Sequence, residues 1–459
     1  MQVVEPLERA AVSALRSRFA GHLIEPVDAG YDQARLVWNA LADKRPALVA
    51  RCARIEDVIA VLDFAREQEL LVAVRGGGHS IPGLSTCDGG VVIDLSPMSR
   101  VTVDAQHRTV RVEGGALLRQ LDAAAQEFAL ACPVGVVGHT GVGGLTLGGG
   151  IGRLQRKYGL TIDNLLACDL VGADGQRIHA SADENQDLFW GLRGAGANFG
   201  VVTSFEFRLS PVGPAVTRGV LTYPLSRAAE VASIYRELAE EAPRELFLAL
   251  GFGQPGPLAP GENHACFIGV MHCGSVAEAE RYLRAVRATR PLSDTIQPMP
   301  YLTTQVAADE ESAWGKRVYM KAAYLPALPE EAVLAMAEQI TASPAGGDCS
   351  VSIWAMGGAI GDVPADATAF SGREAAFWVE MEAVWGDATL DEAHRAWSRA
   401  AISAIQPFIV AGNYVNAVAD SGEEVVRATY GPAKYERLRA LKRRYDPDNV
   451  FRLNQNISP

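Results

Sequence analysis

The stretch LLVAVRGGGHS, residues 70–80, joins an apolar run to three consecutive glycines and a histidine. The run predicts a buried strand, and glycines directly after a strand let several backbone N–H groups face a phosphate. A Rossmann site would need a helix to begin right after the glycines, whereas SIPGLSTCDGG is typical of turns. No glycine cluster ends in Gly-Lys-Ser/Thr, which excludes a P-loop. For this motif alone, a tight turn between strands remains the alternative.

The segments around this motif alternate between strand and helix patterns. RPALVARC (45–52) predicts a strand, and IEDVIAVLDFAREQE (55–69) has apolar residues at helical spacing. Two more glycine clusters follow, GHTGVGGLTLGGGIG (138–152) and GLRGAGANFGVV (191–202), with short strand patterns between them. These patterns predict an α+β domain with three places where the backbone bends sharply or approaches a ligand.

After Pro211 the glycine clusters stop and long helix patterns alternate with strands. The strand patterns include ELFLALGF, HACFIGVMHC and CSVSIWAMGG, and a basic helix near the C-terminus ends at Asp446-Pro447. This region predicts a sheet with helices on one face. In HACFIGVMHC, alternation sends neighbouring side chains to opposite faces, so no metal site is expected. The basic run at residues 442–444 is interpreted as a solvated helix face.

Composition narrows the class of protein. A chain of 459 residues predicts two domains or one domain with an insertion. The net charge of −12 disfavours nucleic acid and anionic membranes as partners and favours a small organic substrate. Seven scattered cysteines without a CxxC indicate neither a disulfide framework nor a zinc ribbon. The N-terminus has charges where a secretory signal needs an apolar core, and no spanning segment follows, so a cytoplasmic location is expected.

Four motifs together resemble one family. RGGGHS, the segment 138–165, RGAGANFGVVTSFEF (193–207), and a C-terminal YVN with KRRYDPDNVFRLNQNI occur in the order and spacing of the berberine-bridge-enzyme-like FAD-linked oxidases of the vanillyl-alcohol-oxidase superfamily. The resemblance spans nearly the whole chain. It is greatest to bacterial members, similar to hydroxynicotine oxidase and to enzymes that tailor secondary metabolites.

The resemblance implies a two-domain α+β fold of the PCMH type with an inserted antiparallel-sheet substrate domain covered by helices. Residues 1–210 would form the FAD domain, 211–410 the substrate domain, and 411–459 a C-terminal segment that returns to the FAD domain. The implied activity is hydride transfer from an alcohol, an amine, or a polyketide- or alkaloid-like metabolite to FAD, which dioxygen reoxidises with release of hydrogen peroxide. A dehydrogenase and a flavin-binding protein without turnover remain alternatives. Sequence leaves the oligomeric state open.

The resemblance also implies how FAD is held. In the family the histidine of RGGGH forms a covalent bond to the flavin, and this maps onto His79. Many relatives add a second bond from a cysteine at the position that is Val137 here, so a single link is expected and Cys132 is expected in the core. The implied cofactor-binding residues are Arg75, Gly76, Gly77, Gly78, His79 and Ser80; Gly138, His139, Thr140, Gly143, Gly144, Gly148, Gly149 and Gly152; Gly200, Val201 and Val202; and Tyr414, Asn416, Asn454 and Asn456.

Three of these residues are also catalytic candidates. Tyr414 matches the family's YxN element, where the tyrosine often serves as base, although a phenol with a pKa near ~10 must then be stabilised as phenolate or pass its proton onward. His139 and Thr140 would face the oxygen side of the flavin, where a small Thr140 leaves room for dioxygen; a purely structural His139 is the alternative. Tyr319, Trp354 and Met356 are candidate walls of the substrate pocket, with core packing as the alternative.

Overall fold

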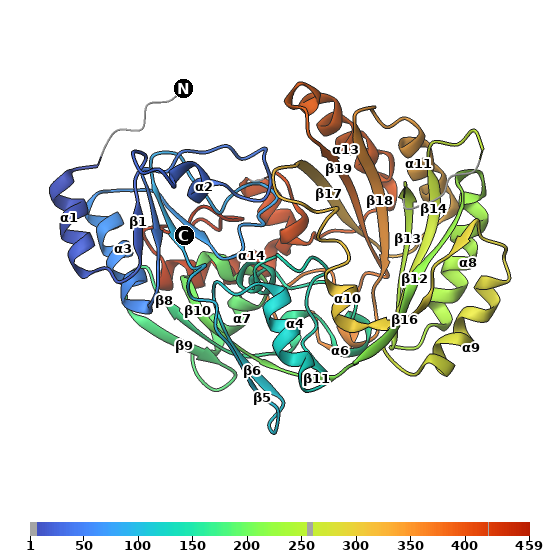
Figure 1. Cartoon of the computed structure of the whole chain (residues 1–459), viewed down its shortest axis with the longest axis horizontal. Coiled ribbons are helices and arrows are strands. Elements are labelled where there is room, and N and C mark those ends of the chain that lie inside the picture. The colour runs from blue at the N-terminus through green and yellow to red at the C-terminus, as the bar shows by residue number, and fades with distance from the viewer. Residues whose placement is uncertain (1–6, 255–259, 421) are drawn as a thin grey trace.

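The computed structural model describes residues 7–254, 260–420 and 422–459. Figure 1 shows two packed halves, with the N-terminal and C-terminal segments together in one and a large sheet in the other. This arrangement is the α+β fold with an inserted antiparallel sheet that the sequence predicts. The boundaries at residues 210 and 410 stay a prediction.

The first half contains two sheets that meet at the glycine motifs. In the smaller sheet, β2 and β3 both run parallel to β4, and helix α3 connects β2 to β3. The apolar run of residues 70–75 thus enters the core as β3 and emerges at the RGGGHS loop. This sheet has the order β1 (His22–Ile24), β2 (Leu48–Arg51), β4 (Val91–Asp94), β3 (Val72–Arg75), and α1 (Arg9–Arg18), α2 (Tyr31–Arg35) and α3 (Ile55–Glu67) accompany it.

The second sheet of this half is antiparallel. Its order is β5 (Val101–Asp104), β6 (Thr109–Glu113), β10 (Val201–Arg208), β8 (Leu165–Val171), β9 (Arg177–Ser181). A short pair joins β7 (Leu130–Ala131) to β11 (Ser210–Pro211). The helices here are α4 (Leu118–Gln126), α5 (Val142–Leu147), α6 (Gln155–Tyr158) and α7 (Gln186–Ala195).

The large antiparallel sheet forms one wall of the site. Its order is β15 (Ser293–Asp294), β12 (Ala215–Pro224), β14 (Ala265–His272), β13 (Leu246–Gly253), β18 (Gly347–Ala355), β19 (Phe377–Trp385), β17 (Arg317–Leu325), and β16 (Gln297–Pro300) also pairs with β12. One face packs on α8 (Ala228–Glu241), α9 (Val276–Arg287), α11 (Glu330–Thr341) and α13 (Asp391–Ala404). Two short helices, α10 (Tyr301–Gln305) and α12 (Ala359–Asp362), lie in the connections. The sheet's other face turns toward the first half.

The chain returns to the first half through α14 (Glu423–Tyr445), which packs on α7. The structure corrects the interpretation of residues 442–444 as a solvated face at one position: Lys442 is fully buried, whereas Arg443 and Arg444 are exposed as expected. Its ammonium group donates to Asp446 at 2.7 Å and to the carbonyls of Asn198 and Phe451 at 3.0 and 2.8 Å. This buried charge is therefore fully hydrogen-bonded, and it fixes the polar tail against the loop that holds Asn198.

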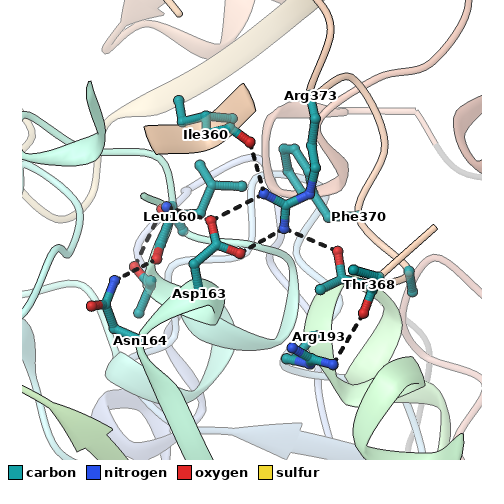
Figure 2. A network of polar contacts seen from close by, with 12 residues as sticks. Leu160, Asp163, Asn164, Arg193, Ile360, Thr368, Phe370 and Arg373 are labelled. Atoms are coloured by element: carbon teal, nitrogen blue, oxygen red, sulfur yellow. Dashed lines mark hydrogen bonds and ion pairs between the residues drawn. The ribbon is translucent and has the colours of Figure 1, made fainter. Parts of the chain in front are cut away.

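A buried ion pair joins the two halves (Figure 2). The Arg373 guanidinium, from the connection before β19, donates to both carboxylate oxygens of Asp163 at 3.0 and 2.6 Å. It also donates to the Ile360 carbonyl and the Thr368 hydroxyl, at 3.3 and 3.0 Å. A bidentate pair fixes both distance and orientation. It therefore holds the large sheet in register with the glycine-rich half. Among the described helices, none is long and apolar enough to cross a membrane.

Candidate active site

A cavity of about 920 Å³ lies between the glycine motifs and the open face of the large sheet. Its volume is at the upper end for a small-molecule or cofactor site. The first half contributes the RGGGHS loop and part of the second glycine cluster, and the large sheet contributes side chains from β12, β13, β14, β18 and β19. Segments that are far apart in the sequence therefore share one site.

The RGGGHS loop presents a row of backbone N–H donors suited to a phosphate group. Residues Gly76 to Ser80 all line the cavity, and none of their five backbone N–H groups donates to an acceptor in the described part of the chain. Unpaired amides are costly unless water or a ligand satisfies them. Successive N–H groups in a loop bind anions, so this row fits the pyrophosphate of FAD. Arg75 lies behind the loop instead: its buried guanidinium donates to Asp94 at 2.7 Å and to the Ala34 carbonyl at 2.6 Å.

His79 is held by two rings and one hydrogen bond. Its imidazole stacks on Trp38, with ring centroids 4.6 Å apart, and its Nε2 lies 2.6 Å from Nδ1 of His139. Burial, together with the nearby His139, lowers the pKa of His79 to about 3. His79 is therefore neutral at physiological pH, with a lone pair on one ring nitrogen, as a nucleophile requires.

The second glycine cluster packs backbone to backbone on the first. A Cβ atom at Gly77 would lie 2.2 Å from the Gly141 nitrogen, so a side chain there would force the two loops apart. Val137, Thr140, Gly144 and Gly148 line the cavity. The other expected glycines of this cluster, Gly138, Gly143, Gly149 and Gly152, do not line it and serve close packing; a Cβ at Gly152 would lie 1.8 Å from the Val134 carbonyl oxygen.

Tyr414 stands where the C-terminal segment reaches the cavity. Its hydroxyl oxygen accepts hydrogen bonds from Asn416 Nδ2 at 3.0 Å and from the backbone amides of Gly150 and Ile151 at 3.2 and 3.3 Å. Burial raises the pKa of Tyr414, and the charge of Glu380 raises it further, whereas these three donors lower it. The net direction is upward, so Tyr414 is a neutral phenol at pH 7 whose oxygen is surrounded by donors.

Only some of the expected residues in the C-terminal tail and the third glycine cluster line the cavity. Asn454 and the neighbouring Gln455 line the cavity, and each has a buried side-chain oxygen without a partner among the described residues. Such orphaned acceptors fit the donor groups of a cofactor. Asn456 does not line the cavity, nor do Gly200, Val201 and Val202, which begin or precede strand β10.

The open face of the large sheet supplies an aromatic wall. Phe247, Trp354, Trp378 and Tyr414 form a chain of ring contacts with centroids 4.9, 5.3 and 5.7 Å apart. Trp354 lines the cavity as expected from sequence. The Trp378 indole N–H is buried without a partner among the described residues, so it is available to a ligand.

Two expected pocket residues lie elsewhere. Tyr319 is on the opposite face of β17, because side chains alternate along a strand and the even-numbered Met320 faces the cavity. The Tyr319 hydroxyl donates to Asp420 at 2.7 Å. Met356 follows the end of β18 and is buried against Gln155, outside the cavity lining. Neither residue is a cavity wall in this structure.

Sequence reasoning missed two carboxyl groups on β19. Glu380 and Glu382 alternate with the buried Val379 and Met381 and point into the cavity with Trp378. Neither carboxyl has a hydrogen-bond or ion-pair partner in the described part of the chain. Burial and the charge of Glu382 raise the pKa of Glu380 to about 8. Burial and the charge of Glu311 raise the pKa of Glu382 to about 7. Two acidic residues on one face of FWVEMEAVW were the available signal, since unpaired carboxyls are rare inside a fold.

The fold and this cavity define an FAD-binding flavoprotein. The family model described as "FAD binding domain" matches residues 46–181, and the model described as "Berberine and berberine like" matches residues 413–458. These two ranges contain the donor row at RGGGHS, the second glycine cluster, Tyr414 and the tail that contacts the cavity.

Relatives of known name extend this result to the whole chain. The chain is 32% identical to (R)-6-hydroxynicotine oxidase of Paenarthrobacter nicotinovorans, covering 96% of this chain and 97% of that one. The solved 6-hydroxy-D-nicotine oxidase of Arthrobacter nicotinovorans has a TM-score of 0.85 at 30% identity, covering 96% and 98%. Berberine bridge enzyme of Eschscholzia californica shares the fold, with a TM-score of 0.87 at 22% identity over 98% and 99%. The chain belongs to the berberine-bridge-enzyme-like family of FAD-linked oxidoreductases.

Proposed function

We propose that this enzyme is an oxidase that transfers a hydride from a small organic substrate to FAD bound covalently through His79, with dioxygen as the final acceptor and hydrogen peroxide as product. The observation that carries the proposal is the cavity itself. One side has a row of amides that have no partner among the described residues and that ends at a neutral histidine. The other has an aromatic wall with two carboxyls that are likewise unpaired within residues 7–254, 260–420 and 422–459. This is the division between cofactor and substrate that such a reaction needs.

The residues present fit the cofactor. The amides of Gly76 to Ser80 would hold the pyrophosphate, and the unpaired oxygens of Asn454 and Gln455 would accept from polar groups of FAD. When bound, FAD supplies the two-electron acceptor that the side chains lack. His79 is the only expected link, because Val137 cannot form a second bond and Cys132 is fully buried with a raised pKa.

The substrate side supplies proton transfer. Oxidation of an alcohol or amine removes a proton from O–H or N–H as the hydride leaves, so a base is required. Tyr414 is a neutral phenol, and it would act by passing its proton onward while the amides of Gly150 and Ile151 stabilise charge on its oxygen. We assign Glu380 as the proton acceptor. Its pKa is about 8, and its charge raises the pKa of Tyr414.

The substrate class remains an alcohol, an amine, or a polyketide- or alkaloid-like metabolite. The aromatic wall from Phe247 to Trp378 favours a substrate with a flat apolar part, since aromatic rings pack against such surfaces. A role in secondary metabolism and a cytoplasmic location also remain predictions. Identification of the substrate and cell fractionation would test them.

Peroxide release measured on a panel of alcohols, amines and polyphenolic metabolites tests the proposed function. Turnover with stoichiometric peroxide is the expected result. Reduction of quinone dyes with negligible peroxide would make the protein a dehydrogenase, and the absence of flavin reduction by any compound would favour a flavin-binding protein without turnover.

Thr140 offers a sharper test of oxygen use, because this small side chain lines the cavity, whereas the preceding His139 lies behind the lining and contacts His79. Thr140→Leu should slow reoxidation of the reduced flavin by air more than it slows reduction by substrate. Thr140→Ser, which keeps the side chain small, is the matched control. Equal effects of Thr140→Leu on both steps would remove Thr140 from the path of dioxygen.

A further inference from the structure

We propose that His139 directs the attachment of FAD: it fixes His79 in the tautomer whose Nδ1 is the nucleophile, and it accepts the Nε2 proton of His79 as the bond forms. The inference rests on the proposed covalent link through His79. It adds a second residue that the link requires, through the tautomer that this residue imposes on His79.

The hydrogen-bond chain behind His79 determines the tautomer. Nε2 of His139 lies 3.3 Å from the backbone carbonyl oxygen of Asp309, and a carbonyl can only accept. His139 therefore carries a proton on Nε2, which leaves the lone pair of its Nδ1 as the acceptor. That nitrogen is 2.6 Å from Nε2 of His79, so His79 must donate from Nε2. Its Nδ1 then keeps the free lone pair.

Several contacts hold this chain in place. The Asp309 carboxylate accepts a hydrogen bond from the Gly138 amide at 2.6 Å, which ties the residue whose carbonyl accepts from His139 to the loop that bears His139. The His79 ring is nearly parallel to Trp38, with an angle of 18° between the planes. Nδ1 of His79 has no protein partner in the described part of the chain. The ring is thus oriented through its Nε2 edge, and His79 itself lines the cavity.

The chemistry balances with dioxygen as the named oxidant. The Nδ1 lone pair of His79 forms a bond to the 8α carbon of the flavin, and a C–H bond of that methyl group breaks with loss of a proton. The electron pair enters the flavin ring system. The alkylated imidazole loses its Nε2 proton to Nδ1 of His139, and dioxygen takes up the two electrons and two protons as hydrogen peroxide. Without His139, the new positive charge on the buried His79 ring would have no acceptor for its proton.

Purified full-length variants test the inference, with bound flavin divided into the fraction released on denaturation and the fraction that stays on the protein. His139→Ala removes the acceptor, and attachment after addition of FAD should slow by about 10²-fold, the size of effect usual for a lost proton acceptor. His139→Asn places an oxygen acceptor near the Nδ1 position without a basic site, so it should keep the same atom of attachment but remain slower than wild type. His107→Ala, at an exposed histidine, is the matched control.

The atom of attachment is read from the histidyl-flavin peptide by NMR. A bond to Nδ1 in the wild-type protein is expected, and non-covalent FAD affinity should change little in the His139 variants. A bond to Nε2, or attachment at the wild-type rate in His139→Ala, would overturn the inference while leaving the covalent link intact. Complete release of flavin from the denatured wild type would instead overturn the covalent link itself, and this inference with it.

Discussion

The replacement Glu380→Gln tests the proposed proton acceptor most closely. Glu380 lies on β19 and points into the cavity beside Trp378, and its carboxyl has no hydrogen-bond partner among the described residues. Burial, then the charge of Glu382, raises its pKa to about 8. Gln has nearly the same shape but cannot accept a proton, so the change isolates proton transfer from packing.

The size of the effect follows from the pKa. With a pKa of about 8, only about one-tenth of Glu380 is ionised at pH 7, so flavin reduction in the wild type should speed up about tenfold between pH 7 and pH 9 and then level off. Glu380→Gln should abolish this rise and slow reduction by about 10²–10⁴-fold, the range for a lost general base.

Anaerobic stopped-flow absorbance across this pH range measures the reduction rate directly, with a substrate from the peroxide screen. Glu382→Gln is the matched control on the same strand face. Because the charge of Glu382 contributes to the raised pKa of Glu380, this control should keep the pH-dependent rise but move its midpoint to lower pH. A Glu380→Gln protein that retains both the rate and the rise would refute the assignment.

Three further results are expected. Tyr414→Phe should slow flavin reduction by about 10²-fold or more while FAD content is kept, measured by single-turnover kinetics, and a near-wild-type rate would remove the hydroxyl from the proton path. Arg373→Met leaves Asp163 buried and unpaired, so the free energy of unfolding should fall by about 3–5 kcal/mol in denaturant titrations, against less than about 1 kcal/mol for the exposed Arg427→Met control; similar losses in both would contradict a structural ion pair. Because burial raises the folded-state pKa of Glu380 above its unfolded value, its carboxyl costs no stability below about pH 4, and the cost grows as pH rises until it levels off above about pH 8. Glu380→Gln should therefore raise the melting temperature of the FAD-free protein increasingly between about pH 5 and pH 8 and by a constant amount above that range, and a pH-independent difference would contradict the raised pKa.

Much of the fold was predictable because its signals are local. Apolar residues at helical spacing mark α3, α8, α9, α11 and α13, and the glycines after residue 75 mark the loop that lines the cavity. The four family motifs then supplied the order of the domains. Both kinds of signal can be recognised in the sequence because they depend on residue type and spacing alone.

The rest of the site depends on contacts between distant segments, which the spacing of residues along the sequence does not reveal. Alternation in β19 places Glu380 and Glu382 on one face, but only the assembled sheet turns that face toward a cavity. Tyr319 was expected at the cavity and lies on the helix-covered face for the same reason. The pairing of His79 with His139 requires two glycine loops to touch, and the burial of Lys442 requires a tail that folds back on its own helix.

Peptide mapping of denatured, acid-precipitated wild-type protein tests whether FAD occupies this cavity and is bound through His79 alone. Trypsin separates the two possible sites, because His79 falls in the peptide of residues 76–100 and Cys132 in that of residues 120–153. We expect flavin mass and fluorescence on residues 76–100 only, at His79. Flavin that washes away completely on denaturation, or that is found on residues 120–153, would contradict it.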